Sequence, residues 1–129
     1  MTTLQFYRRV IEETGQPDRE AAKRVTAAVL RALHDRLTPD EALQVAAQLP
    51  RELKIVWQAG EVAGRRPQKM HRREFYERVK SEAGLASARE ARWGTVAVFA
   101  ALKGQLSPGE ADDVLAQLPK DLKEVWEEA

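Results

Sequence analysis

The chain contains no cysteine, only eight aromatic residues of the Phe, Trp and Tyr type, and no long apolar run. Without cysteine there is no disulfide, no cysteine-ligated metal and no thiol nucleophile, and a reducing compartment is compatible with the composition. No stretch approaches the roughly 18 apolar residues that a membrane-spanning helix needs. The first residues lack the basic-then-apolar layout of a secretion signal. We therefore expect a soluble cytoplasmic protein with no membrane partner.

An excess of one charge is also missing. The 129 residues include 21 basic and 20 acidic side chains, which gives a formal net charge of +1. This balance provides no global electrostatic signature for nucleic acid or anionic membrane. The length suits one compact domain or two very small ones.

An internal repeat with an offset of 69 residues dominates what is present. Of the 55 aligned positions, 6–60 against 75–129, 25 are identical. The repeat is clearest in two segments: Phe6-Tyr7-x-Arg9-Val10 recurs as Phe75-Tyr76-x-Arg78-Val79, and Gln48-Leu49-Pro50 recurs as Gln117-Leu118-Pro119. A single copy of this size would be marginally stable, so we expect the two halves to share a core.

The residue types favour helices throughout, and no stretch alternates apolar and polar residues long enough to predict a strand. Each copy predicts four helices; in the first copy they cover roughly 3–14, 18–37, a segment starting at 38, and a segment after Pro50. The second helix carries an apolar stripe, which is Ala22, Thr26, Val29, Leu33 and Leu37 and recurs identically at 91, 95, 98, 102 and 106. We predict an all-α fold of eight helices, built as two homologous four-helix units (1–60 and 71–129) in one compact domain. A basic linker over 61–70 would let the units dock in several ways.

The third helix of each copy has the strongest start signal. Thr38-Pro39-Asp40-Glu41 and Ser107-Pro108-Gly109-Glu110 both place a hydroxyl at the N-cap, proline at N1 and glutamate at N3. We expect Glu41 and Glu110 each to accept a hydrogen bond from its own N-cap N–H. The alternative is a general acid or base in a site that the repeat duplicates.

These segments resemble the DUF2267 family, a group of small bacterial helical proteins. The resemblance rests on Phe6, Val10, Leu33 and the run from Leu37-Thr38-Pro39-x-Glu41-Ala42 to Ala47-Gln48-Leu49-Pro50, and on the matching residues of the second copy. It covers nearly the whole chain apart from the linker, as two tandem copies. The resemblance implies an all-helical fold and supplies no catalytic residue and no cofactor.

The only charge run is a basic cluster in and after the linker. It consists of Arg65, Arg66, Lys69, Arg72 and Arg73. We expect a solvated linker whose cations pair with acidic helix ends. The alternative is a nucleic-acid contact through phosphates, although the cluster lacks interleaved aromatic residues.

The most informative difference between the two copies is at Arg24-Val25, which becomes Trp93-Gly94. We expect Trp93 to fill the junction between the two halves. Alternatively it is exposed beside a glycine-floored groove and contacts a partner, and such a groove could also bind a small ligand or act as an enzyme pocket.

The two histidines, His34 and His71, lie outside the repeat correspondence and show no metal-ligand spacing, so we expect surface histidines and no metal site. We expect the side chains of Trp57 and Trp126 to be buried in the core. No nucleophile elbow and no phosphate-binding glycine loop is present, so we assign no catalytic, cofactor or metal residue. The sequence favours a non-enzymatic helical module that acts by protein–protein contact or self-association.

Overall fold

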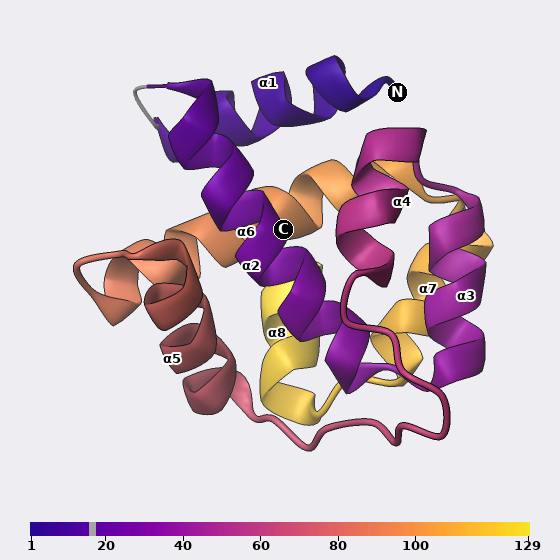
Figure 1. The fold of residues 1–129 in the computed structure, drawn as a ribbon. Coiled ribbons are helices and arrows are strands. Elements are labelled where there is room, and N and C mark those ends of the chain that lie inside the picture. Colours follow the sequence, from indigo (N-terminus) through magenta and orange to yellow (C-terminus); the bar gives the residue numbers. More distant parts are fainter. Residues whose placement is uncertain (16–17) are drawn as a thin grey trace.

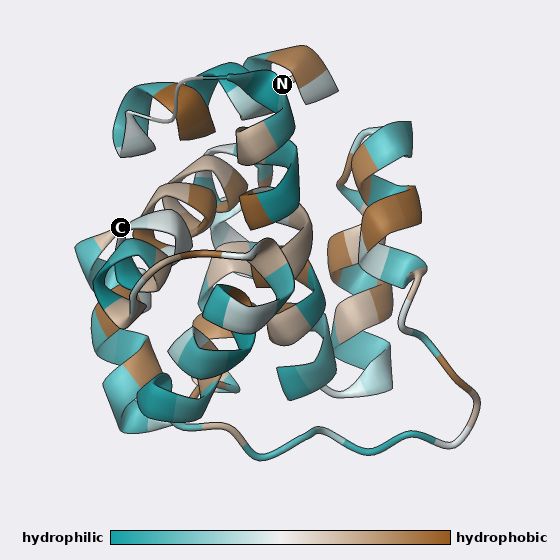
Figure 2. Ribbon diagram, turned by 60° about the vertical axis from the view of Figure 1, so that its left-hand side comes forward, coloured by the Kyte–Doolittle hydropathy of each residue, from teal (hydrophilic) through white to brown (hydrophobic). Residues whose placement is uncertain are grey.

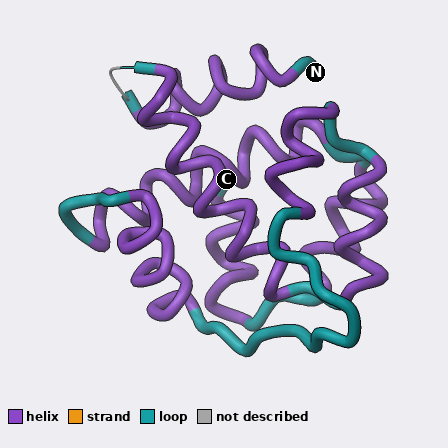
Figure 3. The backbone as a smooth tube through the Cα atoms, viewed as in Figure 1, coloured by secondary structure: helices purple, strands orange, loops and turns teal. Residues whose placement is uncertain are grey.

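The computed structural model describes residues 1–15 and 18–129, and in that part the chain forms eight helices and no strand (Figure 3). The prediction of an all-α fold is confirmed. The helices are α1 (Thr3–Thr14), α2 (Arg19–Arg36), α3 (Pro39–Ala47), α4 (Arg51–Gln58), α5 (Arg72–Ala83), α6 (Ala88–Gln105), α7 (Pro108–Ala116) and α8 (Lys120–Glu128). Both bounds of α1, α2 and α3 recur 69 residues later in α5, α6 and α7. Among the described residues, no helix combines the length and apolar content that crossing a membrane requires.

Local sequence signals set most helix ends. Gly15 and Gly84 end α1 and α5 with a φ of 67°, a left-handed conformation that costs glycine little. The hydroxyls of Thr38 and Ser107 accept hydrogen bonds from the backbone N–H of the third residue of α3 and α7, Glu41 and Glu110, at 3.2 Å in both cases. Pro50 and Pro119 are the N-caps of α4 and α8, directly before the first helical residue.

The two halves are interleaved around one core. Helices α2 and α6 pack against each other; α1 packs on α6 as well as on α2, and α5 packs on α2 as well as on α6 (Figure 1). The predicted stripe is buried in both halves: Val29, Leu33, Val98 and Leu102 are fully buried within a single apolar cluster. Each half therefore covers its partner's long helix with its own first helix.

Gly94 allows the close approach of α2 and α6. A Cβ added to Gly94 would lie 2.6 Å from Cγ1 of Val25, closer than packed carbon atoms approach. Val25 is the residue that aligns with Gly94 in the repeat. The two equivalent positions thus meet each other at the centre of the molecule, and one of them must lack a side chain.

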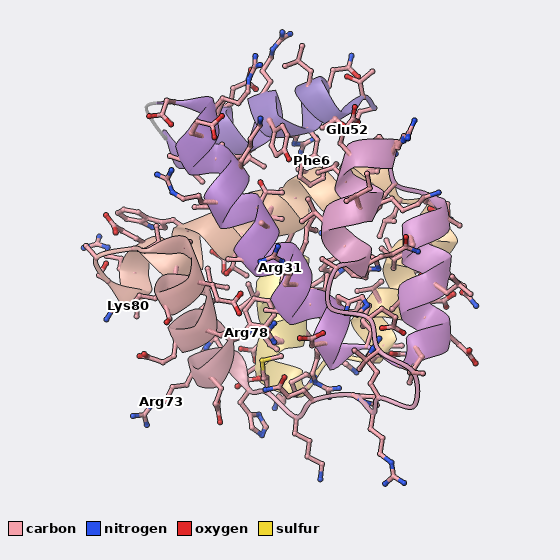
Figure 4. The ribbon with its side chains drawn as sticks, in the orientation of Figure 1. Phe6, Arg31, Glu52, Arg73, Arg78 and Lys80 are labelled. Atoms are coloured by element: carbon pink, nitrogen blue, oxygen red, sulfur yellow. The ribbon has the colours of Figure 1, made fainter. Side chains whose placement is uncertain are left out.

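The linker between α4 and α5 runs along one edge of the molecule as an irregular loop (Figure 3). It is held at defined points: the N–H of Gln68 donates to the carbonyl oxygen of Asp35 at 2.7 Å, and Nη1 of Arg65 donates to the carbonyl oxygen of Leu37 at 2.8 Å. Arg78 of α5 forms an ion pair with the Asp35 side chain at 2.8 Å (Figure 4). The docking of the halves, which the sequence left open, is fixed by these contacts together with the shared core.

Candidate functional site: an apolar groove and a buried carboxyl pair

An open groove of about 370 Å³ lies between α1, α2 and α4. Its apolar wall consists of Leu4 and Tyr7 from α1 and Val56 from α4, and Arg19 and Lys23 of α2 line it as well. Leu4 is 46% exposed, and Ile55, the neighbour of Val56 on α4, is 62% exposed. Leu4 therefore presents an apolar side chain to solvent at the groove. Hydrophobic and hydrophilic residues alternate along the helices of the molecule (Figure 2).

The net charge of the side chains that line the groove is positive, because Arg19 and Lys23 outnumber the one carboxylate, Glu52. Its one acidic lining residue, Glu52 (labelled in Figure 4), accepts a hydrogen bond from Oγ1 of Thr3 at 2.7 Å, and this bond lowers the pKa of the carboxyl. Burial raises the pKa of the Tyr7 hydroxyl, and the negative charges of Glu52 and Glu20 raise it further, so Tyr7 stays neutral. Arg19 forms no ion pair within the described residues. Lys23 makes an exposed contact of 3.6 Å with Glu20, and its Nζ lies 5.9 Å from the centroid of the Tyr7 ring. Such exposed pairs contribute little, so both cations are available to a ligand.

The second half occupies the equivalent positions with charge. Leu4 aligns with Arg73 and Ile55 aligns with Glu124 in the repeat. Arg92, which aligns with Lys23, binds both carboxylate oxygens of Glu128 at 3.0 Å. The N–H of Arg72 donates to Asp121 at 3.0 Å, and the Arg72 guanidinium lies 4.0 Å from Glu124. The two halves therefore differ at equivalent surfaces. In the second half ion pairs join α5 and α6 to α8, whereas in the first half an apolar groove lies between α1, α2 and α4.

A second candidate site lies where α3 and α7 meet, a contact that we call the seam. Here each half caps the helix of the other. The side chain of Gln117 accepts from the N–H of Thr38 at 2.9 Å and donates to the Thr38 hydroxyl at 3.2 Å. The side chain of Gln48 likewise accepts from the N–H of Ser107 at 2.7 Å and donates to its hydroxyl at 3.3 Å. The repeated glutamine of the Gln-Leu-Pro segments is thus a cross-connection between the two halves.

This exchange overturns the predicted role of Glu41 and Glu110. The N-cap N–H groups that these carboxyls were expected to bind are already bound by Gln117 and Gln48. Both glutamates are instead buried at the seam, 8% and 6% exposed, and come close to Asp113 of α7. Burial, a hydrogen bond with Glu41, and the negative charges of Glu41 and Asp113 raise the pKa of Glu110 to about 8. Glu110 therefore holds a proton at neutral pH.

Comparison with known proteins supports the family expected from the motifs. The family described as an uncharacterized conserved protein, DUF2267, matches residues 3–125, which is most of the chain. The chain belongs to the DUF2267 family. The match runs through both halves, so the groove and the seam both lie inside the family region. A search of curated proteins found no match.

In this DUF2267 chain the predicted basic cluster is divided between several environments. The side chain of Arg65 is nearly buried and forms an ion pair with Glu61, and Arg72 faces Asp121 and Glu124. Asp121 lies in the first turn of α8, an acidic helix end of the kind that the sequence suggested, whereas Glu61 belongs to the linker. The other three cations are exposed and form no ion pair within the described part of the chain; they are Arg66, Lys69 and Arg73, the last of which extends outward from α5 (Figure 4).

Trp93 does not fill the junction between the halves. Its side chain is 51% exposed and stacks beside the guanidinium of Arg89 at 5.0 Å from the ring centroid. Its neighbour Gly94 occupies the junction instead, because α2 and α6 are too close there for any side chain. An open hollow of about 190 Å³ lies beside both residues and the end of α1.

The histidine prediction is correct for one residue and wrong for the other. His71 is exposed, but His34 is 1% exposed. Its Nδ1 lies 2.9 Å from Asp35 and its Nε2 lies 2.9 Å from Glu61, while its ring packs edge-on to Trp57. Trp57 and Trp126 are in the core, as predicted. His34 is thus a structural residue that ties the linker to α2.

Two features of the site escaped the sequence reasoning. The groove carries no motif, although the substitution of Leu4 by Arg73 between aligned positions is a signal that could have found it. Asp113 aligns with Gln44 and was overlooked because it has no charged counterpart in the first half. In both cases the informative signal is a difference between the copies and not an identity.

Proposed function

We propose that this protein is a non-enzymatic helical interaction module that binds an acidic amphipathic helix of a protein partner in the groove between α1, α2 and α4. The observation that carries the proposal is the exposure of Leu4 in the groove, at a position where the second half has Arg73. A helix placed in such a groove inserts apolar side chains at i, i+3 or i+4, and i+7.

The charges of the groove select the partner. Arg19 and Lys23 lie on its α2 side, and the acidic Glu52 is already bound by Thr3. A ligand with acidic residues beside its apolar stripe meets two available cations, whereas a basic ligand meets repulsion. Covering the exposed half of Leu4 and of Ile55 contributes about 1 kcal/mol each, so we expect a modest affinity in the micromolar range.

The test uses a synthetic helical peptide of about 16 residues, with leucines at helical spacing and glutamates beside them. We expect it to shift the NMR signals of the Leu4 and Val56 methyl groups and of the Tyr7 ring, and a peptide with lysines in place of the glutamates to bind at least 10-fold more weakly. Leu4→Arg, which installs the residue of the second half, should abolish these shifts. Leu43→Arg, at a 65% exposed position on α3, is the matched control and should leave them intact.

Equal shifts in the two variants, or no shifts in the wild type, would remove the groove as the binding surface. The same variants decide between a partner protein and a second copy of this chain. Concentration-dependent sedimentation that Leu4→Arg abolishes would identify a second copy as the occupant.

Nucleic-acid binding is the second candidate, because Arg66, Lys69 and Arg73 are exposed and unpaired within the described residues. Three phosphate contacts predict a salt slope of about −2.7 by counterion release, smaller than the five cations of the sequence would give. Labelled duplex and single strand should be titrated at two salt concentrations. Binding that disappears when the three cations become glutamine would favour this candidate, and binding that persists would reject it.

A small ligand or substrate beside Trp93 is a third candidate, supported only by the open hollow at that residue. Ligand-dependent quenching of Trp93 fluorescence in a Trp57→Phe/Trp126→Phe background would support it.

We further propose that the chain arose as two tandem copies of one four-helix unit and acts in a bacterial cytoplasm. The 25 identities, the helix bounds repeated at an offset of 69 residues, and the bacterial family that the motifs resemble support this view.

A further inference from the structure

Three carboxylates converge at the seam from both halves of the chain. Glu41 comes from α3 of the first half, and Glu110 and Asp113 come from α7 of the second half. One oxygen from each of the three lies within 4.8 Å of the others. Glu41 and Glu110 are more than nine-tenths buried, whereas Asp113 is exposed and opens the cluster to solvent on one side.

The buried pair has no partner outside the cluster. Oε2 of Glu41 and Oε2 of Glu110 are both buried and receive no hydrogen bond from an N–H or hydroxyl donor. Within the described residues, no lysine, arginine or histidine forms an ion pair with any of the three carboxylates. Basic side chains form nine ion pairs with other carboxylates in the same part of the chain. The capping role is taken by Gln117 and Gln48. Only the proton held by Glu110 offsets the repulsion within the buried pair, and a divalent cation that displaced this proton would neutralise both carboxylates.

We propose that Glu41, Glu110 and Asp113 form a binding site for a hard divalent cation, which links α3 to α7 across the seam. Carboxylate and water oxygens are the ligands that Mg²⁺, Mn²⁺ and Ca²⁺ prefer, and three carboxylates leave coordination positions for water. Ligand oxygens at about 2.1 to 2.5 Å from such an ion lie about 3 to 5 Å from one another, which matches the spacing of the cluster. The cation enters past Asp113, the exposed member.

The cluster combines shared and unshared residues of the repeat. Glu41 and Glu110 align with each other, but Asp113 aligns with Gln44. Among the described residues one such cluster of three carboxylates accordingly forms and not two, and the ion would be placed toward the Asp113 side. Its binding stabilises the contact between the halves, because two of its ligands come from one half and one from the other.

The experiment uses the full chain, freed of metal with EDTA and then dialysed. Mn²⁺ is the probe, because its paramagnetism broadens the NMR signals of nearby nuclei. We expect saturable 1:1 binding, with broadening centred on residues 41–45 and 110–114 and a rise in the melting temperature. Calorimetric titrations with Mg²⁺, Mn²⁺ and Ca²⁺ under the same conditions identify which of the three cations the site prefers.

Asp113→Asn is the decisive variant, because this exposed residue can change without disturbing the core. It should weaken Mn²⁺ binding at least 10-fold, whereas Asp112→Asn, the same charge change one residue away on α7, should leave the affinity within twofold. No saturable binding of any of the three cations up to about 10 mM, beyond the weakest range of functional carboxylate sites, would overturn the proposal. Equal broadening in the Asp113→Asn variant and the wild type would overturn it as well.

Discussion

Replacing Glu110 by glutamine should make the stability of this protein less dependent on pH. The Glu110 carboxyl titrates near its ordinary value of 4.5 in the unfolded chain and at about 8 in the folded one, because burial and Glu41 disfavour its ionised form. The folded state therefore binds more protons than the unfolded state between these two pH values. Its stabilising contribution is complete below about pH 4.5 and is lost as the pH rises through about 8.

The magnitude follows from the same shift. Each pH unit corresponds to about 1.4 kcal/mol, so the upper limit for Glu110 is about 5 kcal/mol between pH 4.5 and 8. We expect roughly half of this, because water reaches the cluster past Asp113 and screens the charge. Glu110→Gln, which has the same shape and no charge, should be about 2 kcal/mol more stable than the wild type at pH 9 and no more stable at pH 5.

Urea denaturation at pH 5, 7 and 9, in the presence of EDTA, measures this effect. Other groups titrate in the same range, so the relevant quantity is the difference in unfolding free energy between the variant and the wild type. Asp112→Asn controls for the loss of one negative charge on α7 and should show a difference that does not change with pH. If the Glu110→Gln difference is equally constant from pH 5 to pH 9, the buried pair does not share a proton and the reasoning fails.

Three further predictions concern the core. Gly94→Ala should lower the unfolding free energy by about 1 to 2 kcal/mol, because the overpacking against Val25 outweighs the gain in helix propensity; in a Val25→Ala background the loss should vanish, as chemical denaturation would show. Val29→Asp should cost at least about 3 kcal/mol and abolish the cooperative melt, since position 29 is fully buried; wild-type-like melting would show that the stripe faces water. A fragment of residues 1–60 should remain unfolded by circular dichroism, because α1 and α2 have lost α6 and α5; a helical, cooperatively melting fragment would contradict the interleaved core.

Local signals in the sequence were sufficient to predict where the helices lie and which face of α2 is buried. Hydroxyl, proline and glutamate at Thr38-Pro39-x-Glu41 predicted the start of α3, because the Thr38 hydroxyl binds an N–H only three residues away. The spacing of Val29 and Leu33 predicted the buried face of α2. The repeat strengthened each of these predictions, since two copies had to satisfy one pattern.

Features that depend on tertiary partners could not be read in this way. The capping-box motif at Glu41 was present in the sequence, but Gln117, 76 residues away, occupies the N–H that Glu41 would have bound. Trp93 was expected at the junction because the face between the halves must be covered, yet α2 and α6 approach so closely at Gly94 that no side chain fits between them there. His34 is buried because the linker brings Glu61 onto it, and the path of the linker had no sequence signal.

The central claim of this account is that the glutamine shared by both halves, Gln48 in the first and Gln117 in the second, binds the N-cap residue of the other half. Hydrogen exchange at two backbone amides tests it most directly, since the N-cap N–H of a helix has no intrahelical partner and exchanges rapidly unless another group binds it. In the wild type the amides of Thr38 and Ser107 should both be protected. Gln117→Ala should accelerate exchange at least 10-fold at Thr38 and not at Ser107, and Gln48→Ala should do the reverse. Rapid exchange at both amides in the wild type, or acceleration within the mutated half, would contradict the claim.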